Sequence, residues 1–230
     1  MKITKLQLYT NQLQDLKVFY VMVLGFELQN ENETAFTLKA GNSLLEFRWN
    51  PPGENTNPSY HFAFNIPENQ IEEARRWLYM RSIPLLKHEG DDILDFPHWN
   101  ANALYFLDPS NNIVEFIARH DLNNTSDAPF SAQSICSVSE IGLPVPNLPG
   151  MHQQVKEKLG LSIYSKVGNT TNFCPMGTPD GLFIIVRTNR TWLPTELPNG
   201  VYPTVVTIEG ETPDELTFEE VPYIVRVAHS

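Results

Sequence analysis

The chain has 230 residues, of which 41% are hydrophobic and 19% charged, and its formal net charge is −11. This acidity argues against nucleic acid as a partner, because phosphate backbones are bound by clustered Lys and Arg. No window approaches the roughly 18 apolar residues of a membrane span, and no apolar stretch of signal-peptide length opens the chain. The two cysteines lie far apart and form no Cys-x-x-Cys pair. We therefore expect a cytoplasmic protein, not bound to a membrane, whose partner is a small molecule.

The first unit of the chain has the pattern of one strand, one helix and three further strands. Leu6 and Leu8 alternate with polar neighbours over residues 3–9, which predicts a strand with one apolar face. Apolar residues recur at helical spacing over residues 13–24, and Gly25 supplies a natural stop. Three strands are then predicted at residues 26–29, 35–39 and 43–49.

The same order restarts after a Pro-rich and Gly-containing break at residues 51–58. A predicted strand at 61–66 leads into a predicted helix at 67–80. Three strands follow, and an Asp-Pro-Ser-Asn-Asn turn joins the last two. These strands are predicted at residues 85–88, 103–107 and 113–118. Two successive units with one element order indicate a duplicated βαβββ module.

Residues 121–134 are crowded with Asn, Asp, Ser and Pro, and we interpret them as a linker. The pattern then returns in weaker form, with strands at 138–145, 182–187, 201–208 and 223–227 and a helix at 152–159. We therefore expect an α+β fold with a complete pair of modules in 1–120. Residues 135–230 are expected to form a degenerate second pair, of which the last module is truncated.

Two segments carry a resemblance to a known family. Residues 16–26, Leu-Lys-Val-Phe-Tyr-Val-Met-Val-Leu-Gly-Phe, place an aromatic pair before a Leu-Gly-aromatic helix end. Residues 105–116, Tyr-Phe-Leu-Asp-Pro-Ser-Asn-Asn-Ile-Val-Glu-Phe, join an Asp-Pro turn to a strand with one Glu. In this order the chain resembles the vicinal oxygen chelate superfamily, which includes glyoxalases, bleomycin resistance proteins and extradiol dioxygenases. The resemblance implies paired modules whose curved mixed sheets surround a cup-shaped site.

The resemblance also implies metal ligands on the first and last strands of the modules. The matching positions hold Glu46, His61 and Glu115, a set suited to Fe, Mn, Ni, Co or Zn. Glu115 or Glu46 would then serve as a general base. The fourth position, usually His in the family, is Lys5, which cannot act as a ligand while protonated.

Strand alternation supports these positions independently. On the strand at 43–49, Glu46 and Arg48 share the face opposite Leu45 and Phe47. Such apolar faces should cover helices, which leaves the polar faces to line the cup. The residues expected to contact a ligand there are Lys5, Gln7, Tyr9, Arg48, Trp99 and Asn100.

Two functions stay open. One is a metal-dependent enzyme that holds the vicinal oxygens of a small molecule, either a glyoxalase-type lyase or isomerase or a ring-cleaving dioxygenase. The other is a metal-free binding protein like the bleomycin resistance members, in which Lys5 neutralises Glu46 and Arg48 neutralises Glu115. The modules would pair within one chain, giving a monomer, or between two chains of a homodimer.

The C-terminal half shows no complete ligand set of its own. The positions that correspond to Glu46 and His61 hold Ile185 and Pro203. Glu140 is instead expected in a charged cluster with Arg187 and Arg226.

Overall fold

A computed structural model describes residues 1–50, 57–166 and 171–229 of the chain. Residues 51–56 of the predicted break between the first two units lie outside the described residues. No helix in the described ranges is both long enough and apolar enough to cross a membrane.

The described residues form fifteen strands and few helices, which confirms the predicted α+β class. The first unit comprises β1 (Ile3–Thr10), α1 (Leu13–Lys17), η1 (Val18–Val23), β2 (Glu27–Asn32), β3 (Ala35–Ala40) and β4 (Ser43–Trp49). The second comprises β5 (His61–Ile66), α2 (Ile71–Tyr79), β6 (Leu85–Leu86), β7 (Leu94–Phe96), η2 (Pro97–Trp99), β8 (Ala101–Leu107) and β9 (Ile113–Arg119).

The second half of the chain has the same elements in reduced form. After η3 (Ala132–Ser134), the third unit comprises β10 (Ser137–Val145), α3 (Leu148–Leu159), β11 (Phe173–Thr178) and β12 (Gly181–Arg187). The last unit comprises β13 (Thr204–Glu209), β14 (Asp214–Thr217) and β15 (Tyr223–Ala228), with no helix in its described residues.

The predicted helix at 13–24 is divided into α1 and the π-helix η1. The Leu24 amide donates a hydrogen bond of 2.9 Å to the carbonyl of Phe19, five residues back. Gly25 then takes a φ of +74°, a conformation that a residue with a side chain rarely adopts. The helix α3 begins at Leu148, earlier than predicted, because the Asn147 side chain caps it by accepting a bond from the Gly150 amide at 3.1 Å.

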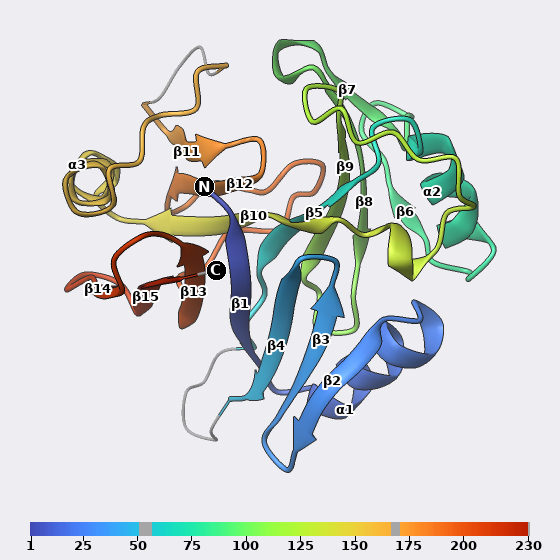
Figure 1. Cartoon of the computed structure of the whole chain (residues 1–230), viewed down its shortest axis with the longest axis horizontal. Coiled ribbons are helices and arrows are strands. Elements are labelled where there is room, and N and C mark those ends of the chain that lie inside the picture. Colours follow the sequence, from blue (N-terminus) through green and yellow to red (C-terminus); the bar gives the residue numbers. More distant parts are fainter. Residues whose placement is uncertain (51–56, 167–170, 230) are drawn as a thin grey trace.

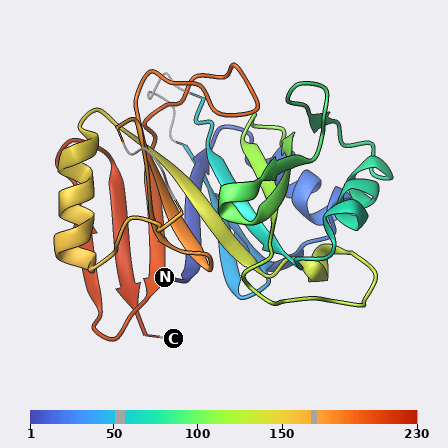
Figure 2. The ribbon, with the colours of Figure 1, turned by 90° about the horizontal axis from the view of Figure 1, so that it is seen from above.

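All fifteen strands belong to one sheet, and its order joins units that are distant in the sequence. Strand β1 of the first unit pairs antiparallel with β13 of the last, and β5 of the second pairs antiparallel with β10 of the third. The modules of this chain are thus paired with one another. Figure 1 shows β1 and β5 near the middle of the molecule, and Figure 2 shows α3 at one end with α1 and α2 at the other.

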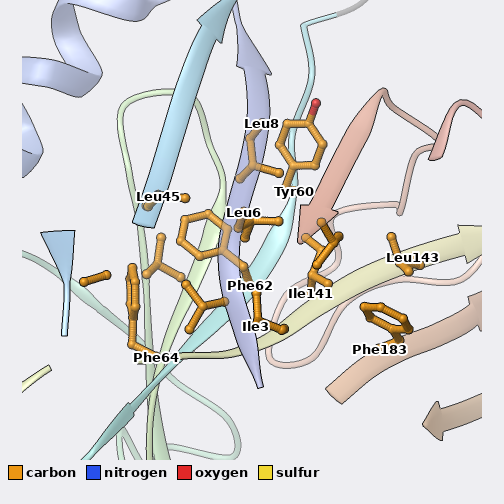
Figure 3. Packing of buried hydrophobic residues seen from close by; sticks show 14 of the residues in the cluster. Ile3, Leu6, Leu8, Leu45, Tyr60, Phe62, Phe64, Ile141, Leu143 and Phe183 are labelled. Carbon is orange, nitrogen blue, oxygen red and sulfur yellow. The ribbon is translucent and has the colours of Figure 1, made fainter. Parts of the chain in front are cut away.

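The main hydrophobic core lies beneath the central strands. It includes Leu6 and Leu8 of β1 and Phe62 and Phe64 of β5, all with no exposed surface (Figure 3). Burying a side chain of this size contributes about 1.5–3 kcal/mol. Because side chains alternate along a strand, the packing of Phe62 and Phe64 turns His61 and Ala63 to the opposite face. That opposite face carries the candidate site.

Candidate functional site

Three buried side chains from neighbouring strands meet on the face opposite the main core. His61 begins β5, while Glu115 on β9 and Glu140 on β10 both lie opposite Ala63, the next residue of β5 on the same face. The small Ala63 side chain leaves room between the two carboxylates. One ligand atom from each of His61, Glu115 and Glu140 lies within 4.8 Å of the other two.

The hydrogen bonding of His61 fixes which ring nitrogen faces this group. Its Nδ1 lies 3.1 Å from the carbonyl oxygen of Ile113, and a carbonyl only accepts, so Nδ1 carries the proton. Burial lowers the pKa of His61 to about 4, although the bond to Ile113 opposes this shift. The ring is therefore neutral at pH 7. The Nε2 atom, which carries the lone pair, lies 3.5 Å from Oε2 of Glu115.

Of the two carboxyl groups, Glu115 is the one whose ionised form is less stabilised by its neighbours. Burial raises its pKa well above the ordinary value, and the neighbouring charge of Glu140 adds to the shift. The Arg119 charge and a hydrogen bond from the Tyr105 hydroxyl act in the opposite direction. Two acceptors, His61 Nε2 and the Glu115 carboxylate, thus face each other, and the arrangement is favourable only with a proton or a cation between them.

Arg119 supplies the positive charge beside Glu140. Its guanidinium group is only 1% exposed and forms an ion pair with the Glu140 carboxylate through Nη2, while Nε donates to Ser139 Oγ at 3.3 Å. Burial raises the pKa of Glu140, and Arg119 opposes that shift. Among the described residues, Nη1 of Arg119 has no hydrogen-bond partner.

The group lies in a cavity of about 320 Å³, which we call the aromatic cavity. It is lined by His61, Phe96, Trp99, Tyr105, Glu115, Ile117, Glu140, Phe173, Ile184, Arg190, Trp192 and Leu193. The Trp192 ring centroid lies 4.9 Å from that of His61, and the Trp99 and Phe173 centroids are 6.2 Å apart. The cavity therefore combines an aromatic wall with a floor of titratable groups.

A model of the Glyoxalase/Bleomycin resistance protein/Dioxygenase superfamily matches residues 2–116, half of the chain. The chain belongs to this superfamily. The resemblance read from residues 16–26 and 105–116 is thereby confirmed. The superfamily match ends before β10 begins, so Glu140 lies outside it.

Two solved structures share the fold of the whole chain. A dioxygenase-like protein from Bacillus subtilis has 12% identity and a TM-score of 0.65, with 99% of this chain and 85% of that chain covered. A mutant of glyoxalase I from Zea mays has 11% identity and a TM-score of 0.58, with 98% and 92% covered. No curated protein sequence matches the chain.

The ligand positions carried over from the superfamily do not meet in one place. The structure brings His61 and Glu115 together, but Glu46 lies on β4, between β1 and β3. Its carboxylate contacts Lys5 Nζ at 2.6 Å and Arg48 Nε at 2.5 Å. Burial acts to raise the pKa of Glu46, but the hydrogen bonds from Lys5 and Arg48 prevail, and the pKa is lowered. Lys5 thus neutralises Glu46, as the metal-free alternative supposes, whereas Arg48 pairs with Glu46 and not with Glu115.

The other residues expected to bind a ligand are divided between two places. Trp99 lines the aromatic cavity. Asn100 is exposed and donates a hydrogen bond to Asp121 at 2.8 Å. Gln7 and Tyr9 lie on β1, where the Gln7 side chain donates to the Tyr9 hydroxyl at 3.0 Å, and both pair with the strand that carries Glu46 and Arg48.

The sequence interpretation missed Glu140 as a member of the site. The cluster expected for it with Arg187 and Arg226 is wrong, because Glu140 pairs with Arg119 and Arg226 pairs with Glu215 at 2.7 Å. One feature of the sequence could have indicated it. Glu140 is the only titratable residue of β10, the first strand of the third unit, just as His61 is the only titratable residue of β5, the first strand of the second. Trp192 and Arg190 carried no comparable signal, since they follow β12 in an irregular segment.

Proposed function

We propose that this superfamily member is an enzyme that binds one divalent metal ion through His61, Glu115 and Glu140 and acts on a small molecule with vicinal oxygens. The observation that carries the proposal is the set of three buried ligand atoms within 4.8 Å of one another at a cavity floor. One imidazole and two carboxylates suit Mn, Fe, Co, Ni or Zn. When bound, such an ion would supply Lewis-acid polarisation of the substrate oxygens.

The donors fit a cation for a reason beyond their spacing. The Ile113 carbonyl holds His61 in the tautomer whose Nε2 lone pair points to the group, which is the second-shell arrangement of metal-binding histidines. The same orientation sets that lone pair against the Glu115 carboxylate. A cation between them would relieve the contact between two acceptors.

The position on β12 that corresponds to Glu115 on β9 holds an apolar residue. On β5, His61 is followed two residues later by Ala63, which pairs with Glu115 of β9. On β10, Glu140 is followed two residues later by Gly142, which pairs with Ile184 of β12. Ile184 therefore occupies in the third unit the place of Glu115 in the second. A site with three protein ligands and one apolar corner leaves positions open for substrate oxygens.

Glu115 is the residue that we propose to move a proton. It lines the cavity, accepts a hydrogen bond from Tyr105, and has a pKa raised by burial, which makes its carboxylate a stronger base than an exposed one. Glu46, the second base expected from the sequence, is a weaker candidate. Its two cationic partners lower its pKa, and it does not line this cavity.

Metal content tests the assignment. Protein purified without chelators or a metal-affinity tag is expected to hold about one equivalent of a transition metal by elemental analysis. His61→Ala and Glu140→Gln are each expected to lower metal affinity at least about ten-fold. Glu46→Gln is the matched control, a buried carboxylate lost from another cluster, and it should retain the metal. Metal lost from Glu46→Gln but kept in Glu140→Gln would contradict the proposal.

A metal-free binding protein is the second candidate, and one observation favours it. Arg119 compensates Glu140, and Glu115 is easily protonated, so the floor of the cavity can reach neutrality without an ion. Protein that takes up no metal under replete conditions, and whose unfolding is unchanged by a chelator, would support this candidate over the enzyme.

A further inference from the structure

Arg190 is a cation at the aromatic cavity that the proposed chemistry does not use. It lies just after β12, and its Cζ is 5.4 Å from the ring centroid of Phe173. Its Nε donates a hydrogen bond to the carbonyl of the adjacent residue, Thr191, at 3.4 Å. No carboxylate in the described part of the chain forms an ion pair with it, although the chain has a net charge of −11.

The surroundings of Arg190 are suited to a flat ring. Trp99, Phe173 and Trp192 line the same cavity, and aromatic side chains stack on planar ligands by offset or edge contacts. The volume of about 320 Å³ lies at the small end of the range for ligand pockets, which fits a molecule of one or two rings.

The floor of the cavity does not repel an anion as two carboxylates alone would. Arg119 is paired with Glu140 and supplies a positive charge beside the two carboxylates. A bound divalent ion would add further positive charge. An acid can therefore enter with its ring along the aromatic wall and its charged group at Arg190.

We propose that the ligand of this cavity is a planar aromatic molecule with a carboxylate, which Arg190 pairs with and thereby selects over neutral analogues. This inference rests on the proposed function, because it assigns a ligand class to the same cavity. A guanidinium group presents a planar fork of donors that matches a carboxylate, and such charge-assisted bonds are stronger than neutral ones.

Binding of 2-naphthoate and its neutral analogue 2-naphthamide to the full chain, measured by calorimetry after metal removal, tests the inference. The acid is expected to bind about ten-fold more tightly or better, which corresponds to about 1.4 kcal/mol. Arg190→Gln should reduce this preference to within about two-fold by weakening only the acid. Arg187→Gln is the matched control, because Arg187 is exposed and outside the cavity lining, and it should keep the preference.

Equal affinity for the two probes, no binding of either, or a preference that survives in Arg190→Gln would overturn the inference. Loss of the preference in Arg187→Gln to the same extent would overturn it as well, because a general charge effect would then explain it. The metal proposal fails separately. Metal bound without an acid preference contradicts only the ligand class, and an acid preference without metal uptake contradicts only the metal site.

Discussion

Two buried glutamates of this chain show how neighbours decide what a carboxylate can do. Glu46 has two cationic partners, Lys5 and Arg48, within 2.6 Å, so its charge is satisfied inside the protein. Within the described residues Glu140 has one cationic partner, Arg119, and it lies close to Glu115 and the Nε2 lone pair of His61. The same residue type is therefore neutralised in one place and left open to a ligand or ion in the other.

Replacing Arg119 by Met is expected to destabilise the metal-depleted protein by about 3–5 kcal/mol, because Glu140 would stay buried beside Glu115 without its cation. Urea unfolding of the parent and the variant measures the difference. The double variant Arg119→Met/Glu140→Gln should recover part of the loss, since it removes the uncompensated charge. A single-variant loss below about 1 kcal/mol, the usual worth of an exposed pair, would be inconsistent with this role.

At the scale of the element, a glycine in β10 determines how close a wall of the aromatic cavity lies to the strand. A Cβ added to Gly142 would come within 2.6 Å of Cη2 and 2.7 Å of Cζ2 of Trp192. Both distances are shorter than van der Waals contact, so the ring can lie against the strand only because residue 142 has no side chain.

The Gly142→Ala variant is therefore expected to push Trp192 away and narrow the cavity. Overpacking of this kind costs about 1–3 kcal/mol of stability. Affinity for 2-naphthamide should fall, and the tryptophan fluorescence spectrum should change. The double variant Gly142→Ala/Trp192→Phe should lose less stability than the two single losses added together, because the smaller ring removes the clash. Strict additivity would show that the two residues do not interact.

Elements with a strong alternating pattern were the ones that the sequence could predict. The predicted strands at 43–49 and 61–66 coincide with β4 and β5. The strand β11, Phe-Cys-Pro-Met-Gly-Thr, contains Pro and Gly, and β14, Asp-Glu-Leu-Thr, is acidic and short, so neither had a readable pattern. Both form because a neighbour, β12 or β15, supplies the hydrogen bonds.

The candidate site was predicted only in part for a related reason. Alternation correctly placed His61 and Glu115 on the faces opposite Phe62 and Phe116. The third member depends on the pairing of β5 with β10, in which Phe62 lies opposite Ile141. Residues 79 positions apart carry no local signal of such a register, so Glu46 was grouped with the site in place of Glu140.

At the scale of the whole molecule, one sheet unites the two halves. Residues 1–120 contain β1 and β5, and each has an antiparallel partner from the second half, β13 and β10. A fragment of residues 1–120 would expose both edges together with the apolar surface beneath them.

We expect such a fragment to self-associate or aggregate in size-exclusion chromatography with light scattering, since a second copy could supply the missing strands. The full chain under the same conditions is the control for column behaviour. A soluble fragment that is monomeric, with the circular dichroism of a folded β-rich protein, would contradict the expectation and show that the first two units are self-sufficient.

The continuity of the sheet also determines how a bound compound would change the thermal unfolding of the protein. The aromatic cavity takes residues from β5, β9, β10 and the segment after β12, so a bound molecule contacts both halves at once. A compound that binds only the folded form raises the melting temperature by mass action. Because the strands of both halves belong to one hydrogen-bonded sheet, we expect the whole chain to unfold in one transition at the raised melting temperature. Thermal-shift screening of aromatic acids should therefore rank ligands without an activity assay.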